Sequence, residues 1–192
     1  LIVIPDWETA DTHGRVALRL NPGLTFGTGS HATTRLCLQA LEKRVGPGMD
    51  VLDLGCGSGI LSIAALLLGA RRAFACDIDE KAVGVAYENA ALNAVGRDVY
   101  TVRAGDVLTD QGLRRDMGTG YHVVLANIVS DVIIALAPAV GPLLAPEGVF
   151  ICSGIIDQRQ EEVRRCLEEA GFRIEETGSS EGWFSFVCRK GR

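Results

Sequence analysis

The chain has 192 residues, of which 47% are hydrophobic and 22% are charged, and its formal net charge at pH 7 is -5. This length suits a single domain with a sizeable core, and the composition excludes a disordered or fibrous protein. The net negative charge argues against a protein that holds nucleic acid by neutralising phosphates, and it weakly favours a basic protein partner.

The apolar runs, the cysteines and the first residues indicate a cytoplasmic protein with no membrane partner. The longest apolar run, residues 60–68, is too short to span a bilayer. The chain begins LIVIPDW, without the basic segment of a secretory signal peptide. The six cysteines show neither a C-x-x-C pair nor the spacing of a zinc site. We therefore expect small buried thiols in a reducing compartment and no metal site.

The first part of the chain predicts a strand, a loop and a helix. Residues 16–20 alternate apolar and charged side chains, which is typical of an edge strand. The opening motif NPGLTFGTGSHATTR, residues 21–35, contains three glycines and several hydroxyls. Apolar residues then recur at helical spacing over residues 32–45, until GPG ends the pattern. The opening motif therefore resembles a phosphate-binding loop at first inspection.

From residue 50 onward, short apolar runs alternate with helical patterns, which predicts a parallel sheet covered by helices on both faces. The expected strands are residues 50–54, 72–76, 99–105, 121–127 and 148–154. The expected helices are residues 60–68, 80–93, 130–140 and 157–170, and the stretch 110–120 is expected to be a surface loop.

The end of the chain predicts a reversal of strand direction. FRIEET and WFSFVCR are separated only by GSSEG, which suits an antiparallel hairpin and is too short for a crossover helix. The predicted fold class is therefore a Rossmann-like, doubly wound α/β fold. Its sheet is mostly parallel and seven-stranded, with a C-terminal antiparallel hairpin strand.

A second glycine-rich segment, LDLGCGSGI, follows the first strand of the sheet, where α/β proteins bind cofactors. Gly55, Gly57 and Gly59 allow backbone N–H groups to approach a carboxylate or a phosphate. The spacing is G-x-G-x-G, and the third glycine of a dinucleotide fingerprint would fall on Ile60, which disfavours a dehydrogenase. Close packing of strand and helix is the alternative explanation for such glycines.

Acidic residues follow the next two strands. Asp77 lies 22 positions after Gly55, where a carboxylate can accept hydrogen bonds from both hydroxyls of a ribose. Asp79 is better placed than Asp77 to cap the following helix. Asp106 can accept a hydrogen bond from an adenine amino group, and its alternative role is to cap a loop.

This order of motifs resembles the class I S-adenosylmethionine-dependent methyltransferases, over residues 51–188. The resemblance implies S-adenosyl-L-methionine as the cofactor. That molecule has a carboxylate, a ribose and an adenine but no phosphate, so it requires no lysine-bearing phosphate loop, and the sequence contains none.

Asn127 ends the fourth strand on the side of the same crevice and is the candidate catalytic residue. Its side-chain oxygen, with a nearby backbone carbonyl, can accept hydrogen bonds from an amine and aim the lone pair at the methyl group. Such a transfer mainly needs the reacting atoms held about 3 to 3.5 Å apart. The alternative is a helix cap, a role that Ser130 or Asp131 also suits. Many amino-methylating relatives have Asn-Pro-Pro-Tyr here, and the departure after Asn127 argues against a glutamine or nucleobase substrate.

Four segments closely resemble the bacterial ribosomal protein L-eleven methyltransferases, the PrmA family. They are the opening motif, the glycine loop with its helix, CDIDEKAV with the following NAALN, and VVLANIV. The resemblance implies methylation of lysine side chains and the N-terminal amine of a basic ribosomal protein, with no direct nucleic-acid partner. The expected cofactor contacts are Phe26, Thr28, Thr34, Gly55, Gly57, Gly59, Asp77, Asp106 and Asn127.

Residues 1–192 are expected to form a single class I methyltransferase domain. Residues 1–31 would supply an opening strand and a cofactor-covering loop, and residues 32–192 the catalytic core, with the family's N-terminal substrate-docking domain absent. We interpret the opening motif as a lid, with Thr34 near the cofactor carboxylate at a helix N-terminus and His31 as a candidate substrate contact. Two alternatives stay open: a methyltransferase for another protein lysine or small amine, and a cofactor-binding module without turnover.

Overall fold

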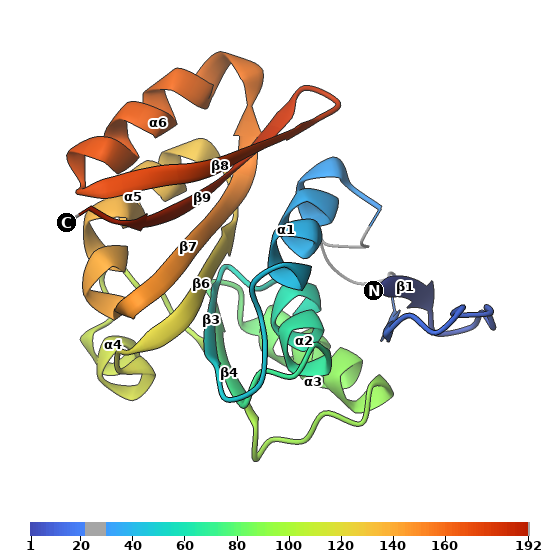
Figure 1. Ribbon diagram of the computed structural model, residues 1–192. Helices are drawn as coiled ribbons and strands as arrows, with labels where there is room; N and C mark the ends of the chain where they lie inside the picture. The colour runs from blue at the N-terminus through green and yellow to red at the C-terminus, as the bar shows by residue number, and fades with distance from the viewer. Residues whose placement is uncertain (22–29, 192) are drawn as a thin grey trace.

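The structure, a computed structural model, describes residues 1–21 and 30–191 (Figure 1). The strands of this part are β1 (Ile2–Pro5), β2 (Ala17–Leu20), β3 (Asp50–Leu54), β4 (Arg72–Asp77), β5 (Tyr100–Ala104), β6 (Tyr121–Asn127), β7 (Leu144–Ile156), β8 (Phe172–Ser180) and β9 (Trp183–Lys190). The α-helices are α1 (Ala32–Glu42), α2 (Ile60–Leu67), α3 (Glu80–Leu92), α4 (Gln111–Met117), α5 (Ser130–Val140) and α6 (Gln160–Glu169).

Seven strands form the central sheet in the order β5-β4-β3-β6-β7-β9-β8. The five strands from β5 to β7 run parallel to one another, and β9 is antiparallel to both β7 and β8. The prediction of a doubly wound, mostly parallel sheet with a C-terminal antiparallel hairpin is therefore confirmed.

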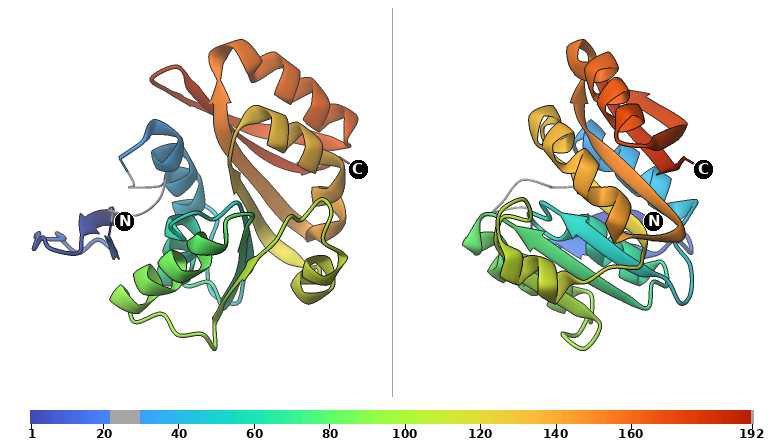
Figure 2. Two further views of the ribbon diagram at one scale, coloured as in Figure 1. Left: turned by 180° about the vertical axis from the view of Figure 1, so that it is seen from behind. Right: turned by 90° about the vertical axis from the view of Figure 1, so that its left-hand side faces the viewer.

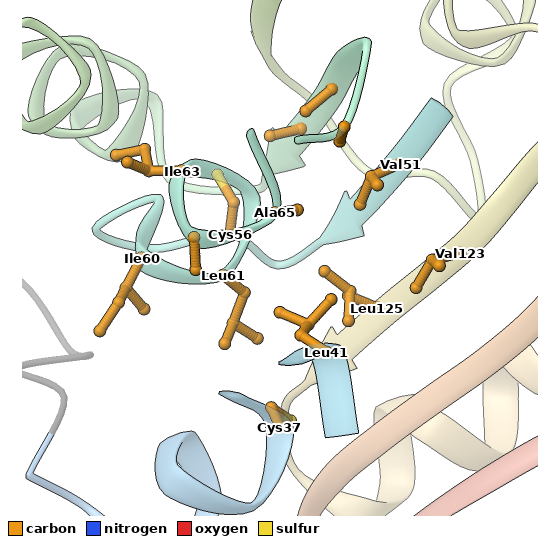
Figure 3. Packing of buried hydrophobic residues seen from close by; sticks show 14 of the residues in the cluster. Cys37, Leu41, Val51, Cys56, Ile60, Leu61, Ile63, Ala65, Val123 and Leu125 are labelled. Carbon is orange, nitrogen blue, oxygen red and sulfur yellow. The ribbon is translucent and has the colours of Figure 1, made fainter. Parts of the chain in front are cut away.

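Helices cover both faces of this sheet, as the views in Figure 2 show. Side chains of the central strands alternate between two buried clusters. Val51, Val123 and Leu125 pack with α1, α2 and α3, whereas Leu52 and Val124 pack with α4, α5 and α6. Figure 3 shows the first cluster from close by. Because both faces are covered, the central strands are almost continuously apolar.

The first two strands lie outside the main sheet. β1 and β2 pair with each other in parallel, and β2 contacts α2 and α3. The sequence predicted β2 and missed β1, because four residues at the start of a chain carry too little pattern to assign.

The prediction of a surface loop over residues 110–120 was wrong, because α4 occupies most of this stretch. The Asp110 side chain accepts a hydrogen bond from the Leu113 N–H at 3.0 Å and thereby caps the helix. Leu113 and Met117, four residues apart, are both buried in the second cluster. This packing stabilises a helix that Gly112 and the short length argue against.

Two further features bear on the predictions about compartment and membrane. The six cysteines are free thiols, and five of them are buried. Among the helices of the described residues, none has the length and apolar character needed to cross a membrane.

Candidate active site

A cavity of about 540 Å³ lies at the carboxyl ends of the parallel strands. Its walls include the residues that directly follow β3, β4, β5 and β6. β3 and β6 are neighbours at the centre of the sheet, and the chain leaves them toward opposite edges. Ligands of α/β proteins bind at such a switch point.

The glycine loop between β3 and α2 forms one wall of the cavity. Gly55, Gly57 and Gly59 all have a positive φ, of 74°, 51° and 78°. Gly55 and Gly57 line the cavity. A Cβ at Gly59 would instead lie 2.8 Å from the Tyr100 hydroxyl and 3.0 Å from the Ala86 Cβ. The third glycine therefore permits close packing of the loop, and its predicted contact with the cofactor stays a prediction.

Asp77 lines the cavity at the end of β4 and also holds the glycine loop. Its Oδ2 accepts a hydrogen bond from the Gly57 N–H at 2.8 Å, and its Oδ1 accepts one from the Asp79 N–H at 3.0 Å. Asp79 caps α3 by accepting from the Lys81 N–H at 2.9 Å, as predicted. A carboxylate has about four lone-pair sites, so Asp77 retains acceptor capacity for a ligand.

Asp106 lines the cavity after β5 and also acts as a loop cap. Its Oδ1 accepts from the Leu108 N–H at 2.8 Å, and its Oδ2 accepts from the Thr109 hydroxyl at 3.1 Å. Ile78, which is 78% exposed, and Val107 supply apolar surface to the same region of the cavity. The cap and the predicted adenine contact are compatible.

Asn127 is half-buried at the end of β6 and lines the cavity. Its Nδ2 donates a long hydrogen bond, 3.4 Å, to the hydroxyl of the buried Thr34. The amide is thus oriented with Oδ1 turned away from Thr34. α5 begins after Val129 without a side-chain cap, so Asn127 is not the cap of that helix. Thr34 contacts the amide of Asn127, and its predicted contact with the cofactor stays a prediction.

Three residues of the cavity wall surround the start of α1. His31 is the N-cap of that helix, and its Nδ1 accepts from the Thr33 N–H at 3.3 Å. The His31 ring meets the Trp183 ring edge-on, with 5.0 Å between centroids. His31, Thr33 and Trp183 all line the cavity. Sequence reasoning missed Trp183, because only the hairpin reversal brings the first residue of β9 to this place.

Asp53 is a second residue that sequence reasoning missed. It lines the cavity but is only 1% exposed. Its Oδ2 accepts from the Ser62 hydroxyl at 2.9 Å, while its Oδ1 is buried without a hydrogen-bond partner among the described residues. Burial raises the pKa of Asp53 to about 7, because desolvation disfavours the charged carboxylate. Asp53 Oδ1, a buried carboxylate oxygen without a hydrogen-bond partner among the described residues, suits a cationic ligand group.

The family model of the ribosomal protein L11 methyltransferases (PrmA) matches residues 1–191. The chain belongs to this family. The ribosomal protein L11 methyltransferase of Anoxybacillus flavithermus is 44% identical to the chain over 190 residues, which cover 98% of this chain and 59% of that protein. The corresponding protein of Heliobacterium modesticaldum is also 44% identical, over 99% of this chain and 58% of that protein.

A solved structure gives the same result for the fold of this PrmA-family chain. The ribosomal protein L11 methylase of Lactobacillus delbrueckii subsp. bulgaricus superimposes with a TM-score of 0.88 at 30% identity, covering 99% of this chain and 94% of that one. The resemblance inferred from the motifs is therefore confirmed. The chain spans about three fifths of the length of the curated relatives it matches.

Two predictions for this PrmA-family chain fall on the opening motif. Phe26 and Thr28 lie outside the described residues. Within residues 1–21 and 30–191, no group of three or more His, Cys, Asp or Glu side chains is arranged to hold a metal ion.

Proposed function

We propose that this chain is the catalytic domain of an S-adenosylmethionine-dependent methyltransferase that acts on amino groups of a ribosomal protein. The observation that carries the proposal is the cavity at the switch point of the sheet, where Asp77, Asp106 and Asn127 follow three different strands. Family membership gives the reaction class, because the relatives are named as methyltransferases of ribosomal protein L11.

The cavity offers a suitable partner for each part of the cofactor. Asp77 accepts from the ribose hydroxyls, and Asp106 accepts from the adenine amino group while Ile78 flanks the ring. Asp53 would accept from the ammonium group of the methionine portion through Oδ1, which has no hydrogen-bond partner among the described residues. A buried carboxylate without a partner is costly, so pairing with a cation stabilises both groups. The cofactor, when bound, supplies an electrophilic methyl group on a sulfonium.

The glycine loop fits the same ligand. Gly55 and Gly57 line the cavity and carry no side chain. A Cβ on Gly55 would lie 2.6 Å from Ile128 Cγ2, so this glycine also lets the β6 end pack against the loop. The cofactor and the Asn127 region are thereby brought next to each other.

Asn127 orients the amine that is to be methylated. Its Oδ1 and the backbone carbonyl of the neighbouring Ile128 would accept hydrogen bonds from the amine and direct its lone pair to the methyl group. Val129, which is 64% exposed, and Trp183 give the cavity an apolar side that suits the aliphatic stem of a lysine. Apolar surroundings also favour the neutral amine, which is the nucleophilic form.

The substrate and the domain organisation are part of the proposal. We assign the relatives' substrate class, a basic ribosomal protein, to this chain, and therefore a cytoplasmic location. Residues 1–192 would form one catalytic domain. Docking of the whole ribosomal protein would use sequence that the relatives have beyond the matched three fifths.

The direct test is methyl transfer from labelled S-adenosylmethionine to purified ribosomal protein L11, with Asn127→Ala as the control for background label. We expect label on lysine or N-terminal amines with the unaltered chain only. If only unrelated proteins or small amines were labelled, the assignment of a ribosomal protein as the substrate would be wrong. Cofactor binding without any transfer, even to short lysine-containing peptides of the ribosomal protein that need no docking, would favour a module without turnover. If calorimetry showed binding of NAD and no binding of S-adenosylmethionine, the assignment of the cofactor would be wrong.

A further inference from the structure

Two asparagines of the NAALN segment are not among the residues that line the cavity, but they bind the backbone of the glycine loop and of residues 19–21. Asn89 lies in the last turn of α3, and Asn93, four residues later, is the C-cap residue that directly follows the helix. Asn89 is completely buried. Both side chains turn toward β2, which carries the chain into the opening motif.

The Asn93 side chain exchanges two hydrogen bonds with the backbone of Arg19 in β2, as a residue of a neighbouring strand would. Its Oδ1 accepts from the Arg19 N–H at 2.8 Å, and its Nδ2 donates to the Arg19 carbonyl at 2.7 Å. Asn89 binds the next N–H on the same edge of the strand. Its Oδ1 accepts a hydrogen bond from the Asn21 N–H at 2.9 Å. Four residues of helix span about 6 Å and two residues of strand about 6.6 Å, so the two spacings match.

Asn89 has a second contact, with the glycine loop. Its Nδ2 donates to the Ser58 carbonyl at 2.9 Å. Ser58 is buried and stands between Gly57, whose N–H is held by Asp77, and Gly59. A single amide therefore joins the cofactor loop on one side to the backbone at Asn21 on the other.

The packing of α3 makes this contact possible. Apart from Asn89, the buried residues of α3 are Ala82, Ala86 and Ala90. These small side chains let the glycine loop approach the helix closely, as the 3.0 Å between Ala86 Cβ and a Cβ built on Gly59 indicates. A buried amide is costly unless its polar groups are paired, and both ends of the Asn89 amide are paired. The result is a direct connection between the glycine loop and the backbone at the end of β2.

We propose that Asn89 is a positioning residue that couples the cofactor loop to β2, so that ligand binding at the glycine loop stabilises the backbone at Asn21. The inference rests on the proposed cofactor site. A ligand that restricts Gly55 and Gly57 also restricts the Ser58 carbonyl between the loop and α3. The Asn89 amide transmits this restriction to the Asn21 N–H, where the opening motif begins.

The test is amide hydrogen exchange of the full chain with and without saturating S-adenosylhomocysteine, in the unaltered protein, Asn89→Ala and Asn93→Ala. The two variants are matched, because each removes one amide that binds the backbone of residues 19–21 and only Asn89 contacts the glycine loop. In the unaltered protein we expect the ligand to slow exchange at residues 55–59. We also expect it to slow exchange at residues 17–21 by about fivefold or more, because fivefold is the lower end of typical coupling between two sites.

The variants separate coupling from a merely structural role. Asn93→Ala is expected to exchange faster at residues 17–21 but to keep the slowing by ligand. Asn89→Ala is expected to lose the slowing at residues 17–21 while residues 55–59 still respond. Asn21→Pro removes the N–H from which Asn89 Oδ1 accepts a hydrogen bond and leaves α3 unaltered. This variant is expected to lose the response to ligand at residues 17–20, and it tests the coupling if Asn89→Ala does not fold.

Two outcomes would overturn different claims. If residues 55–59 of the unaltered protein do not respond to the ligand, the proposed cofactor site is wrong, and the coupling falls with it. If residues 55–59 respond and residues 17–21 do not, or if Asn89→Ala and Asn21→Pro keep the full response, the coupling alone is wrong.

Discussion

The carboxylate of Asp77 accepts a hydrogen bond from the backbone N–H of Gly57 at 2.8 Å, so the residue assigned to the cofactor ribose also fixes the glycine loop. Asp77→Ala is expected to weaken S-adenosylmethionine binding by at least about tenfold. Hydrogen bonds to a charged acceptor contribute about 1.5 to 3 kcal/mol each, and the variant loses those of the ligand and of the loop. Titration calorimetry measures the change.

Asp79→Ala is the matched control for this prediction. It removes the carboxylate that caps α3 through the Lys81 N–H and leaves Asp77 in place. The variant is expected to lose about 1 kcal/mol of stability, as other N-cap deletions do, with cofactor affinity nearly unchanged. Equal losses of affinity in both variants would show that Asp77 acts only through the fold.

Asn127→Ala is expected to lower the rate of methyl transfer by about 100-fold, because a misplaced nucleophile reacts far more slowly. Cofactor affinity is expected to remain within a few-fold, because Asn127 is assigned mainly to the amine. Thr34→Val removes the hydroxyl that accepts from Asn127 Nδ2 and should reduce the rate by a smaller factor. Single-turnover rates measure the effect on methyl transfer, and calorimetry on the same samples measures the effect on cofactor affinity. An unchanged rate in Asn127→Ala would contradict the role of Asn127 in orienting the amine.

The sequence was sufficient to predict the residues that topology places at the cavity. Asp77, Asp106 and Asn127 follow parallel strands, and the carboxyl ends of such strands share one edge of the sheet. No further information was needed to group them, because the alternation of strand and helix already implied their proximity.

The remaining residues could not be predicted for reasons that differ in kind. Asp53 lies inside an apolar strand, and only the structure shows that one of its oxygens has a partner in Ser62 while the other has none. Trp183 reaches the cavity through the register of β9 against β7, where it pairs with Ile156. Long-range pairing of this kind leaves no local pattern in the sequence.

Asp53→Asn is expected to stabilise the ligand-free protein increasingly as the pH rises from 5 to 8. Burial raises the pKa of Asp53 from 3.8 to about 7 in the folded state. Between these values the unfolded chain loses the proton that the folded chain retains, so the free energy of unfolding falls with rising pH. The full cost is on the order of 4 kcal/mol, at about 1.36 kcal/mol for each pH unit. Urea unfolding at pH 5 and pH 8 measures the part of this cost that builds up above pH 5, about 2.7 kcal/mol for the two units up to the folded pKa of about 7.

Asp50→Asn is the control for this pH dependence, because the pKa of Asp50 is shifted the opposite way. Hydrogen bonds from Arg71, and then from Arg72, lower it. Asp50 therefore stabilises the protein above pH 3.8 and loses this contribution only in more acidic solution. The variant is expected to be destabilised similarly at pH 5 and pH 8, and a pH-independent effect of Asp53→Asn would contradict the assignment.

Cofactor binding is expected to release a proton from Asp53 near neutral pH. A cation beside its Oδ1 favours the ionised carboxylate and lowers the pKa from about 7, so affinity should rise as the pH increases through this value. Calorimetry in buffers with different heats of ionisation measures the released proton. Asp53→Asn has no proton to release, and a release that persists in this variant belongs to another group.

Gly55→Ala is expected to destabilise the protein more than Gly171→Ala does. Both glycines have a positive φ, 74° and 87°, which costs an alanine about 1 to 2 kcal/mol. A Cβ at Gly171 would meet nothing within 4 Å, whereas one at Gly55 would lie 2.6 Å from Ile128 Cγ2. Overpacking of this kind costs about 1 to 3 kcal/mol more. Because Ile128 follows Asn127, the Gly55 variant should also lose methyl transfer, and equal urea midpoints for the two variants would contradict the steric argument.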